Sequence, residues 1–366
     1  IIRSHFFYFL IFIFIYFFLE IICYFVLKKL TPHGIYPSIK LINQDIEAYN
    51  KSKNLNLGWL SKTDDKDEYG GRKVKNSSLY NSICFEVYGD SYTESVDVDY
   101  ENSWPSLLSK KLNCRVLNFG VQGYGTDQSF IRYMNNNKKA SIVAINHFSE
   151  NVVRNINQFR NLLYPTENIM LKPRFILNKN KIKLVETPKI YNLNKNDIFK
   201  ELKNEYFLPG DETGIIDNIN YSYIYNLYKI LTNHHKFKAF FKNEPHSKQF
   251  YNINHQSKAL EITSQILFDF HNFAVNRNQI AIITIIPHCK DFDYYKKNNK
   301  IPYQNLIDKL NLQNIFFIDF LPKIFEKYPN YKNLYTKKCK GQHFNHVGNK
   351  VLSEIFHEFL KENKIF

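Results

Sequence analysis

FEVYGDSYT, residues 85–93, is a stretch in which a short apolar and aromatic strand ends in Gly-Asp-Ser, where a helix can begin. A serine on such a strand-to-helix turn presents its Oγ at the carboxyl edge of a sheet. The N–H groups and dipole of the following helix then stabilise an oxyanion there. Ser91 is therefore a candidate nucleophile. An ordinary turn with a helix-capping serine contains the same three residues, so other segments have to decide between the two interpretations.

Two further segments offer donors for an oxyanion. Residues 118–126, Asn-Phe-Gly-Val-Gln-Gly-Tyr-Gly-Thr, follow a strand-like Arg-Val-Leu and contain three glycines, among them Gly123. Glycines let backbone N–H groups approach a bound group closely. Asn151 follows the apolar run 142–145 and offers a side-chain amide. Both segments come after predicted strands, as an oxyanion site at the sheet edge requires.

A candidate base lies near the C-terminus. His343 precedes an amphipathic helix predicted over 347–362, with Val351, Leu352, Ile355 and Phe359 on one face. This position puts a histidine at a helix start, where it is available for proton transfer. His346 and His288 are the alternative bases, and each is better explained as a helix N-terminal or loop histidine.

Ser91, Gly123, Asn151 and His343 resemble, in order and context, the four blocks of the SGNH (GDSL-type) hydrolases. The likeness covers residues 83–151 and 280–360, and the stretch 120–127 is similar to that of membrane-anchored bacterial envelope members. The resemblance implies a Ser91–His343 acyl-enzyme mechanism with Ser91, Gly123 and Asn151 at the oxyanion hole. It implies no cofactor and no metal.

The chain departs from this family beside the histidine. The family carries an aspartate two or three residues before it, but Lys340 and Gly341 occupy those positions here. The tautomer of His343 then depends on a distant acid or on a backbone carbonyl. Asp319, at the end of the last predicted strand, is the candidate acid, although it also suits a helix cap, and a carbonyl is the slightly favoured alternative.

Strands and helices alternate along the core of the sequence, which predicts an α/β fold. We expect a doubly wound, flavodoxin-like parallel sheet of about five strands with helices on both faces. The candidate site then lies at the carboxyl ends of the strands. Strands are expected at 83–88, 115–117, 141–146, 279–286 and 315–319, and helices at 104–112, 127–135, 257–276, 303–310 and 347–362.

Residues 6–27 form an apolar, aromatic-rich run with a single acid, Glu20. A helix of this length spans roughly 33 Å, enough to cross the hydrocarbon core of a bilayer. Lys28 and Lys29 follow where a cleavage site would need small residues, so an anchor is favoured over a signal peptide. The flanking charges weakly favour a cytoplasmic C-terminal domain, whereas the family resemblance implies a single-pass protein with an extracytoplasmic domain.

The predicted domains are a membrane anchor at 1–30, a linker at 31–80 and an SGNH-like hydrolase domain at 81–366. An insertion at about 152–256 is too long for a plain crossover. It is expected to contain a hairpin at 174–185 and an aromatic-rich helix at 221–231. A cap over the active site and a packed flank of the domain are the two interpretations of this insertion.

Charge and cysteine content give no support for nucleic-acid binding or for a cysteine-based metal site. The 366-residue chain has 49 basic and 34 acidic residues, a net charge of +15, but its lysines are scattered and form no nucleic-acid motif. The five cysteines show no metal-binding spacing. Cys84 and Cys114 are expected to be buried free thiols, and Cys289 and Cys339 are a possible disulfide bracing the histidine loop.

The predicted function is a serine esterase or deacetylase that removes an acyl group, such as acetyl, from a glycan or lipid. Two alternatives stay open. The first is an O-acyltransferase acting on a cell-envelope polysaccharide, in which a sugar hydroxyl replaces water as the acceptor. The second is a catalytically inactive SGNH-like binding domain, suggested by the missing aspartate.

Overall fold

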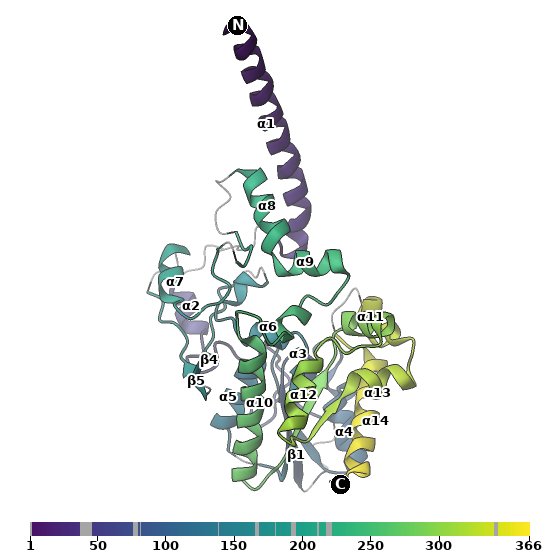
Figure 1. Cartoon of the computed structure of the whole chain (residues 1–366). Coiled ribbons are helices and arrows are strands. Elements are labelled where there is room, and N and C mark those ends of the chain that lie inside the picture. Colours follow the sequence, from purple (N-terminus) through teal and green to yellow (C-terminus); the bar gives the residue numbers. More distant parts are fainter. Residues whose placement is uncertain are drawn as a thin grey trace. The chain divides into compact units, whose positions relative to one another are not determined.

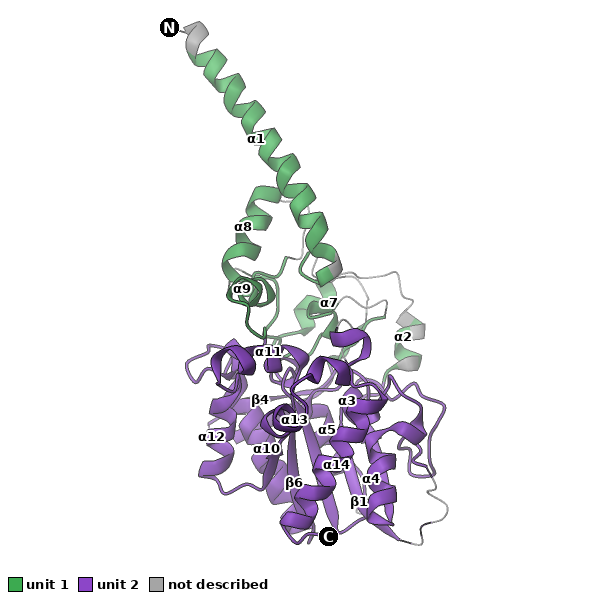
Figure 2. Cartoon of the chain, turned by 90° about the vertical axis from the view of Figure 1, so that its right-hand side faces the viewer, with its two compact units in different colours: residues 1–53, 157–171, 188–246 green, residues 54–156, 172–187, 247–366 purple. Residues whose placement is uncertain are grey.

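The computed structural model describes most of the chain, divided into two compact units (Figure 2). Unit 1 comprises residues 1–53, 157–171 and 188–246, and unit 2 comprises 54–156, 172–187 and 247–366. The described residues are 2–36, 46–75, 80, 82–137, 139–164, 168–179, 181–191, 195–210, 212–216, 222–339 and 343–366.

Unit 2 is built on a five-stranded sheet with the order β2-β1-β3-β6-β7. Every neighbouring pair is parallel, so the sheet is of the predicted doubly wound type. The central strand β3 is buried along its whole length, which accounts for its near-continuous apolar sequence. The strands are β1 (Ile83–Gly89), β2 (Arg115–Gly120), β3 (Ile142–Phe148), β6 (Ile280–Ile286) and β7 (Phe317–Asp319).

Helices cover both faces of this sheet (Figure 1). One layer packs α10 (Ala259–Asn276) against α5 (Thr126–Asn135) and α12 (Gln304–Leu312). The other packs α14 (His346–Glu362) against α4 (Trp104–Leu112) and α13 (Phe320–Lys327). These helices agree with the predicted ones except α13, which the sequence did not reveal, as it did not reveal α11 (Cys289–Asn298).

Aromatic side chains fill both interfaces between sheet and helices. Phe356 of α14 meets the rings of Phe85, Trp104 and Phe320 with centroids 5.6 to 6.0 Å apart. It is completely buried, and truncating such a phenylalanine to alanine typically costs about 3–5 kcal/mol. This packing holds α14, and the histidine that precedes it, against β1, the strand that leads to Ser91.

The insertion between β3 and α10 is divided between the two units. Its hairpin, β4 (Arg174–Asn178) and β5 (Lys181–Val185), belongs to unit 2 and packs on α10 and α5. Phe175 of β4 faces Phe130 of α5 at 5.9 Å between ring centroids. This hairpin therefore packs on a flank of the domain. A cap formed by the rest of the insertion stays a prediction.

Residues 157–171 and 188–246 of the insertion belong to unit 1, together with the N-terminal helix. The predicted aromatic-rich helix is α8 (Tyr223–Asn233), and Tyr221 lies outside the described residues. Helix α9 follows it, and the short helices α2 and α7 complete the unit. Their bounds are α2 (Ile46–Ser52), α7 (Lys195–Glu201) and α9 (His235–Lys242).

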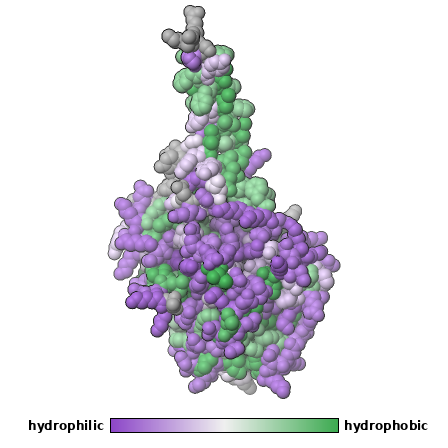
Figure 3. Space-filling model, in the orientation of Figure 1, coloured by the Kyte–Doolittle hydropathy of each residue, from purple (hydrophilic) through white to green (hydrophobic). Residues whose placement is uncertain are grey.

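Helix α1 (Ile2–Leu30) is long and apolar enough to cross a membrane from His5 onwards. Figure 3 shows hydrophobic side chains along its length. Residues 54–75, assigned to a linker from the sequence, lie in unit 2. There the Arg72 guanidinium donates to the carbonyls of Glu94, Ser95 and Val98.

Two disulfides are formed among the described residues. Cys84 and Cys114, expected to be free thiols, are joined with their Cα atoms 5.9 Å apart. The physical reason is strand pairing, because Ile83 of β1 lies opposite Arg115 of β2 and so places the two cysteines side by side. The suggested Cys289–Cys339 bridge is present.

Candidate active site

Ser91 lies at the first residue of α3 (Ser91–Glu94), directly after β1, and is 3% exposed. The carboxylate of Asp90 caps this helix by accepting from the Tyr92 N–H at 3.0 Å. Gly89 is required here, because a Cβ would come within 1.9 Å of the Thr93 hydroxyl oxygen. The turn therefore holds the Ser91 Oγ at the carboxyl end of the central strands, as the Gly-Asp-Ser motif predicts.

The structure brings His343 to Ser91. The His343 Nε2 lies 2.8 Å from the Ser91 Oγ. The histidine backbone is fixed by a bridge between Tyr335 and Phe344, and its carbonyl accepts from the Thr336 N–H at 2.9 Å. The segment therefore positions the imidazole through main-chain bonds, before any side chain acts on it.

The second ring nitrogen of His343 has an acidic partner that the sequence did not reveal. The Asp97 Oδ1 lies 3.2 Å from the His343 Nδ1, and the Thr336 hydroxyl donates to the Asp97 Oδ2 at 3.0 Å. A carboxylate only accepts, so the proton of the neutral imidazole belongs on Nδ1 and Nε2 is free to accept from Ser91. The three side chains form a continuous chain of hydrogen-bond partners.

Asp319, the acid suggested from the sequence, lies elsewhere. Its Oδ1 accepts from the Tyr303 hydroxyl at 2.8 Å and from the Leu321 N–H at 3.0 Å, so it caps α13. Burial raises its pKa to about 7. The carboxylate that lies beside the His343 Nδ1 in the structure is therefore that of Asp97 and not that of Asp319.

The alternative histidines also have other places. His288 caps α11, where its Nδ1 accepts from the Lys290 N–H at 3.1 Å, and burial lowers its pKa. His346 is the first residue of α14. The ring nitrogen beside the Ser91 Oγ is that of His343 and of neither of these histidines. No cluster of metal-ligating side chains is found in the part of the chain that the structure describes.

Gly123 and Asn151 are the two further candidate oxyanion donors. Gly123 has a φ of +84°, in a turn closed by the Tyr124 N–H donating to the Val121 carbonyl at 3.2 Å, a conformation suited to glycine. Asn151 begins α6 (Asn151–Arg154) and is completely buried. Neither polar atom of its amide makes a hydrogen bond of good geometry among the described residues, although the amide lies close enough to the Asp90 carboxylate to act to lower the pKa of that group. Buried amides are normally paired, so an unused one is a feature that a ligand oxygen would satisfy.

Arg154 ties these segments together. Its guanidinium lies 3.1 Å from the Asp90 carboxylate, donates to the Tyr124 carbonyl at 3.0 Å and pairs with Glu150 at 3.2 Å. All of these groups are buried. Burial raises the pKa of Asp90, while the neighbouring Arg154 charge acts to lower it. The nucleophile turn, the glycine turn and α6 are thus held together by one side chain.

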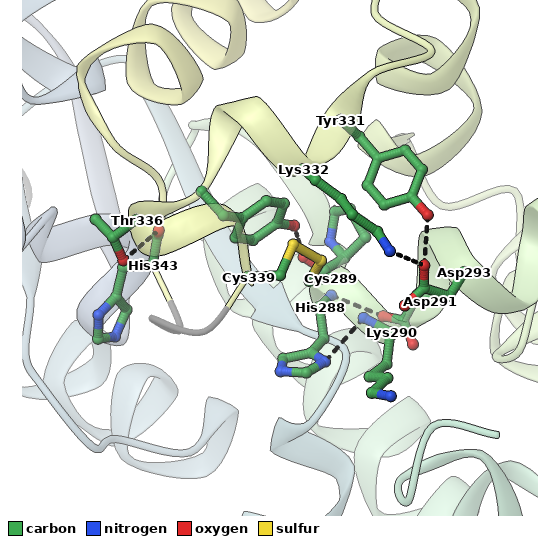
Figure 4. The surroundings of a disulfide bond; sticks show 12 residues. His288, Cys289, Lys290, Asp291, Asp293, Tyr331, Lys332, Thr336, Cys339 and His343 are labelled. Atoms are coloured by element: carbon green, nitrogen blue, oxygen red, sulfur yellow. Dashed lines mark hydrogen bonds and ion pairs between the residues drawn. A yellow bond between two sulfur atoms is a disulfide. The ribbon is translucent and has the colours of Figure 1, made fainter. Parts of the chain in front are cut away.

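The Cys289–Cys339 disulfide ties the start of α11 to the loop between Thr336 and His343 (Figure 4). Lys337, Lys338 and Cys339 have φ values of 48°, 50° and 72°, in the left-handed region that side chains disfavour. Such a run persists only where the surroundings hold it. The disulfide supplies a covalent hold on the loop that carries the contacts to Asp97 and His343.

No family model and no curated protein matches the chain. It is similar to several solved structures, which are GDSL-type lipolytic proteins and esterases, the group that the motifs predict. They include a member of the lipolytic G-D-S-L family from Veillonella parvula (10% identity, TM-score 0.36, covering 75% of this chain and 95% of that one). A lipase/acylhydrolase from Enterococcus faecalis shares 13% identity with a TM-score of 0.34, and the match covers 77% of this chain and 96% of that one. A catalytic mutant of an acetylxylan esterase from Geobacillus stearothermophilus shares 12% identity with a TM-score of 0.34, and the match covers 77% of this chain and 94% of that one. Such low identities and TM-scores assign no activity to this chain, so the site geometry has to carry that step.

Proposed function

We propose that the chain is a serine esterase in which Ser91 is the nucleophile, His343 the base and Asp97 the acid that orients the base. One observation carries this proposal. The Ser91 Oγ, the two ring nitrogens of His343 and the Asp97 carboxylate lie in sequence at 2.8 Å and 3.2 Å. This arrangement is the Ser-His-Asp constellation of acyl-transfer enzymes, recognised by its geometry and not by the order of its residues.

In the proposed reaction, His343 Nε2 takes the Ser91 proton while Oγ attacks the ester carbonyl. The bond between the carbonyl carbon and the leaving alkoxide then breaks, and the alkoxide takes the proton that His343 received from Ser91. Water next attacks the acyl-enzyme, again giving a proton to His343, and the released Ser91 oxygen recovers it. Asp97 stays ionised and stabilises the imidazolium formed in each half-reaction.

The oxyanion of each tetrahedral intermediate needs preorganised donors. Ser91 is the first residue of α3, where a helix N–H has no intrahelical acceptor. The Gly123 N–H and the Asn151 amide are the two further donors in the proposal. Removing one such donor typically costs about 3 kcal/mol of transition-state stabilisation. The fully buried amide of Asn151, which makes no hydrogen bond of good geometry among the described residues, supports its assignment to this role.

The proposed substrate is an acylated glycan or lipid at the cell envelope, and the acyl group is acetyl or of similar size. Two features support the location. Helix α1 would keep the protein at a membrane, and two disulfides favour an oxidising compartment and so an extracytoplasmic domain. The Asp97 contact supports an active enzyme over an inactive binding domain, because the missing acid was the reason to consider the binding domain.

The test is the hydrolysis of a short acyl ester by single and double variants. Ser91→Ala and His343→Ala should each remove nearly all turnover, and the double variant should be little worse than either, because the two residues act as a unit. Ser95→Ala and His346→Ala are matched controls, since the Ser95 hydroxyl donates to the Tyr92 carbonyl and His346 is the first residue of α14. Independent, additive losses would contradict the proposal, as would an active Ser91→Ala variant.

A further inference from the structure

Unit 1 holds α8 and α9 against the last turns of α1. Leu27 of α1 is completely buried, in a cluster that includes Ile230 of α8 and Phe237 of α9. Tyr24 meets the ring of Tyr223 edge-on at 5.2 Å. Figures 1 and 2 both show α8 beside the C-terminal part of α1. The position of α8 is therefore set by the helix that would cross the membrane.

Glu20, the one acid of the apolar run, is part of this attachment. Its carboxylate accepts from the Ser222 hydroxyl and from the Tyr223 N–H at 2.7 Å, at the start of α8. A helix N-terminus stabilises a negative charge through its free N–H groups and its dipole. This pairing explains how a carboxylate is accommodated within an apolar helix, where an unpaired acid would be costly. It also places the start of α8 beside Glu20.

The opposite side of α1 remains apolar and exposed beyond Glu20. Ile21 and Phe25 are 56% and 58% exposed, and Ile22 and Val26 are exposed as well. The part of α1 from Glu20 to its end at Leu30 is roughly 15 Å long. Lipid that covers these side chains has to extend past Glu20 along about the first 10 Å of this part. Lipid at that depth lies at the same level as α8.

Helices α8 and α9 expose large apolar side chains themselves. On α8 these are Tyr225, Tyr228 and Leu231, spaced so that they share one side of the helix. At the end of α9, Phe240 and Phe241 are 75% and 69% exposed. We refer to these five residues as the α8–α9 surface. Tyrosines are enriched where a bilayer meets water, since the ring lies in apolar surroundings and the hydroxyl in polar ones.

The charge of the same segment suits an anionic surface. Residues 222–243 contain four lysines, Lys229, Lys236, Lys238 and Lys242, and no aspartate or glutamate. Basic residues combined with an exposed aromatic and aliphatic face are typical of helices that lie in the membrane interface. Lys236 donates to the Leu163 carbonyl, and each of the other three lysines, where it lies near an anionic leaflet, adds about 1 kcal/mol of attraction.

We propose that the α8–α9 surface lies in the headgroup region of the membrane that α1 crosses, and that it binds an anionic lipid surface there. The protein then contacts the bilayer through a second element, separated from the span by nearly two hundred residues of sequence. Glu20 joins the two elements. This inference depends on α1 being a membrane span and is independent of the catalytic proposal.

The experiment measures the depth of single side chains with the full chain in nanodiscs. Tyr228→Trp and Phe240→Trp place an indole on the α8–α9 surface, and lipids brominated near the glycerol end of the acyl chain quench it on contact. The parent protein, which has only Trp59 and Trp104, gives the background. Leu312→Trp is the matched control, because Leu312 is an apolar side chain of unit 2 that is 79% exposed.

The proposal predicts that both introduced indoles lose roughly half of their emission, while the Leu312→Trp indole loses little. Quenching should be greater in phosphatidylglycerol than in phosphatidylcholine discs, because the lysines attract the anionic headgroups. Quenching of the Tyr228→Trp and Phe240→Trp indoles no stronger than that of the control would overturn the proposal. Equal quenching in the two lipids would refute the preference for anionic lipid.

Discussion

Replacing Asp97 by asparagine removes one charge from the candidate site and keeps its shape. In the structure the carboxylate lies 3.2 Å from the His343 Nδ1. A unit charge at that distance from an imidazolium contributes about 1 kcal/mol in water and about 5 kcal/mol at an effective dielectric constant of 20. The Asp97 side chain is 32% exposed, so its contribution should lie between these limits. At 1.4 kcal/mol for each tenfold change, kcat should fall by about 10²- to 10³-fold.

The assay is the steady-state hydrolysis of a short acyl ester by purified variants. KM should change little, because Asp97 acts on the base and not on the bound ester. Asp319→Asn is the control, since Asp319 caps α13 and asparagine keeps an oxygen for the Tyr303 hydroxyl. An Asp97→Asn variant within twofold of the parent, or a larger loss in Asp319→Asn, would refute the assignment of Asp97.

Two other predictions concern stability and the histidine loop. Burial raises the pKa of Asp291 and of Asp319 to about 7, so the folded state binds more protons than the unfolded chain between about pH 4 and 7. These groups therefore stabilise the fold most at low pH and lose that contribution as the pH rises towards 7, by up to about 1.4 kcal/mol per pH unit each. Urea unfolding from pH 5 to 8 should show a smaller decline in Asp319→Asn than in the parent, and identical slopes would contradict this. Cys339→Ser should lower esterase activity more than Cys84→Ser, because only the Cys289–Cys339 bridge braces the loop beside Asp97. Both bridges close long loops, and each should stabilise the fold by up to about 4 kcal/mol. Equal losses of activity would argue against a role for the braced loop.

The sequence predicted the sheet and its layers well, because the information is local. Buried parallel strands such as β3 and β6 are near-continuous apolar runs, and the helices between them have clear periodicity. The nucleophile turn and the glycine turn were also recognisable, since each depends on residues that are adjacent in the chain. The short helix α13 was missed because its proline and its closeness to β7 hide the pattern.

The parts that could not be predicted depend on contacts between distant segments. Asp97 lies in a polar turn after α3 and meets His343 only once the C-terminal loop is folded against it. The Cys84–Cys114 bridge required knowledge that β1 and β2 are neighbours. The role of Glu20 required the position of α8, which lies about two hundred residues further along the sequence. In each case one partner has no motif of its own.

Covalent labelling of the serine tests the central claim most directly. A fluorophosphonate reacts with a serine that is activated by a base, so incubation of the purified protein followed by peptide mass spectrometry identifies the nucleophile. The account predicts a single adduct on Ser91 that is lost in His343→Ala and is slowed in Asp97→Asn. Absence of an adduct in the parent protein, or an adduct on another serine such as Ser95, would contradict it.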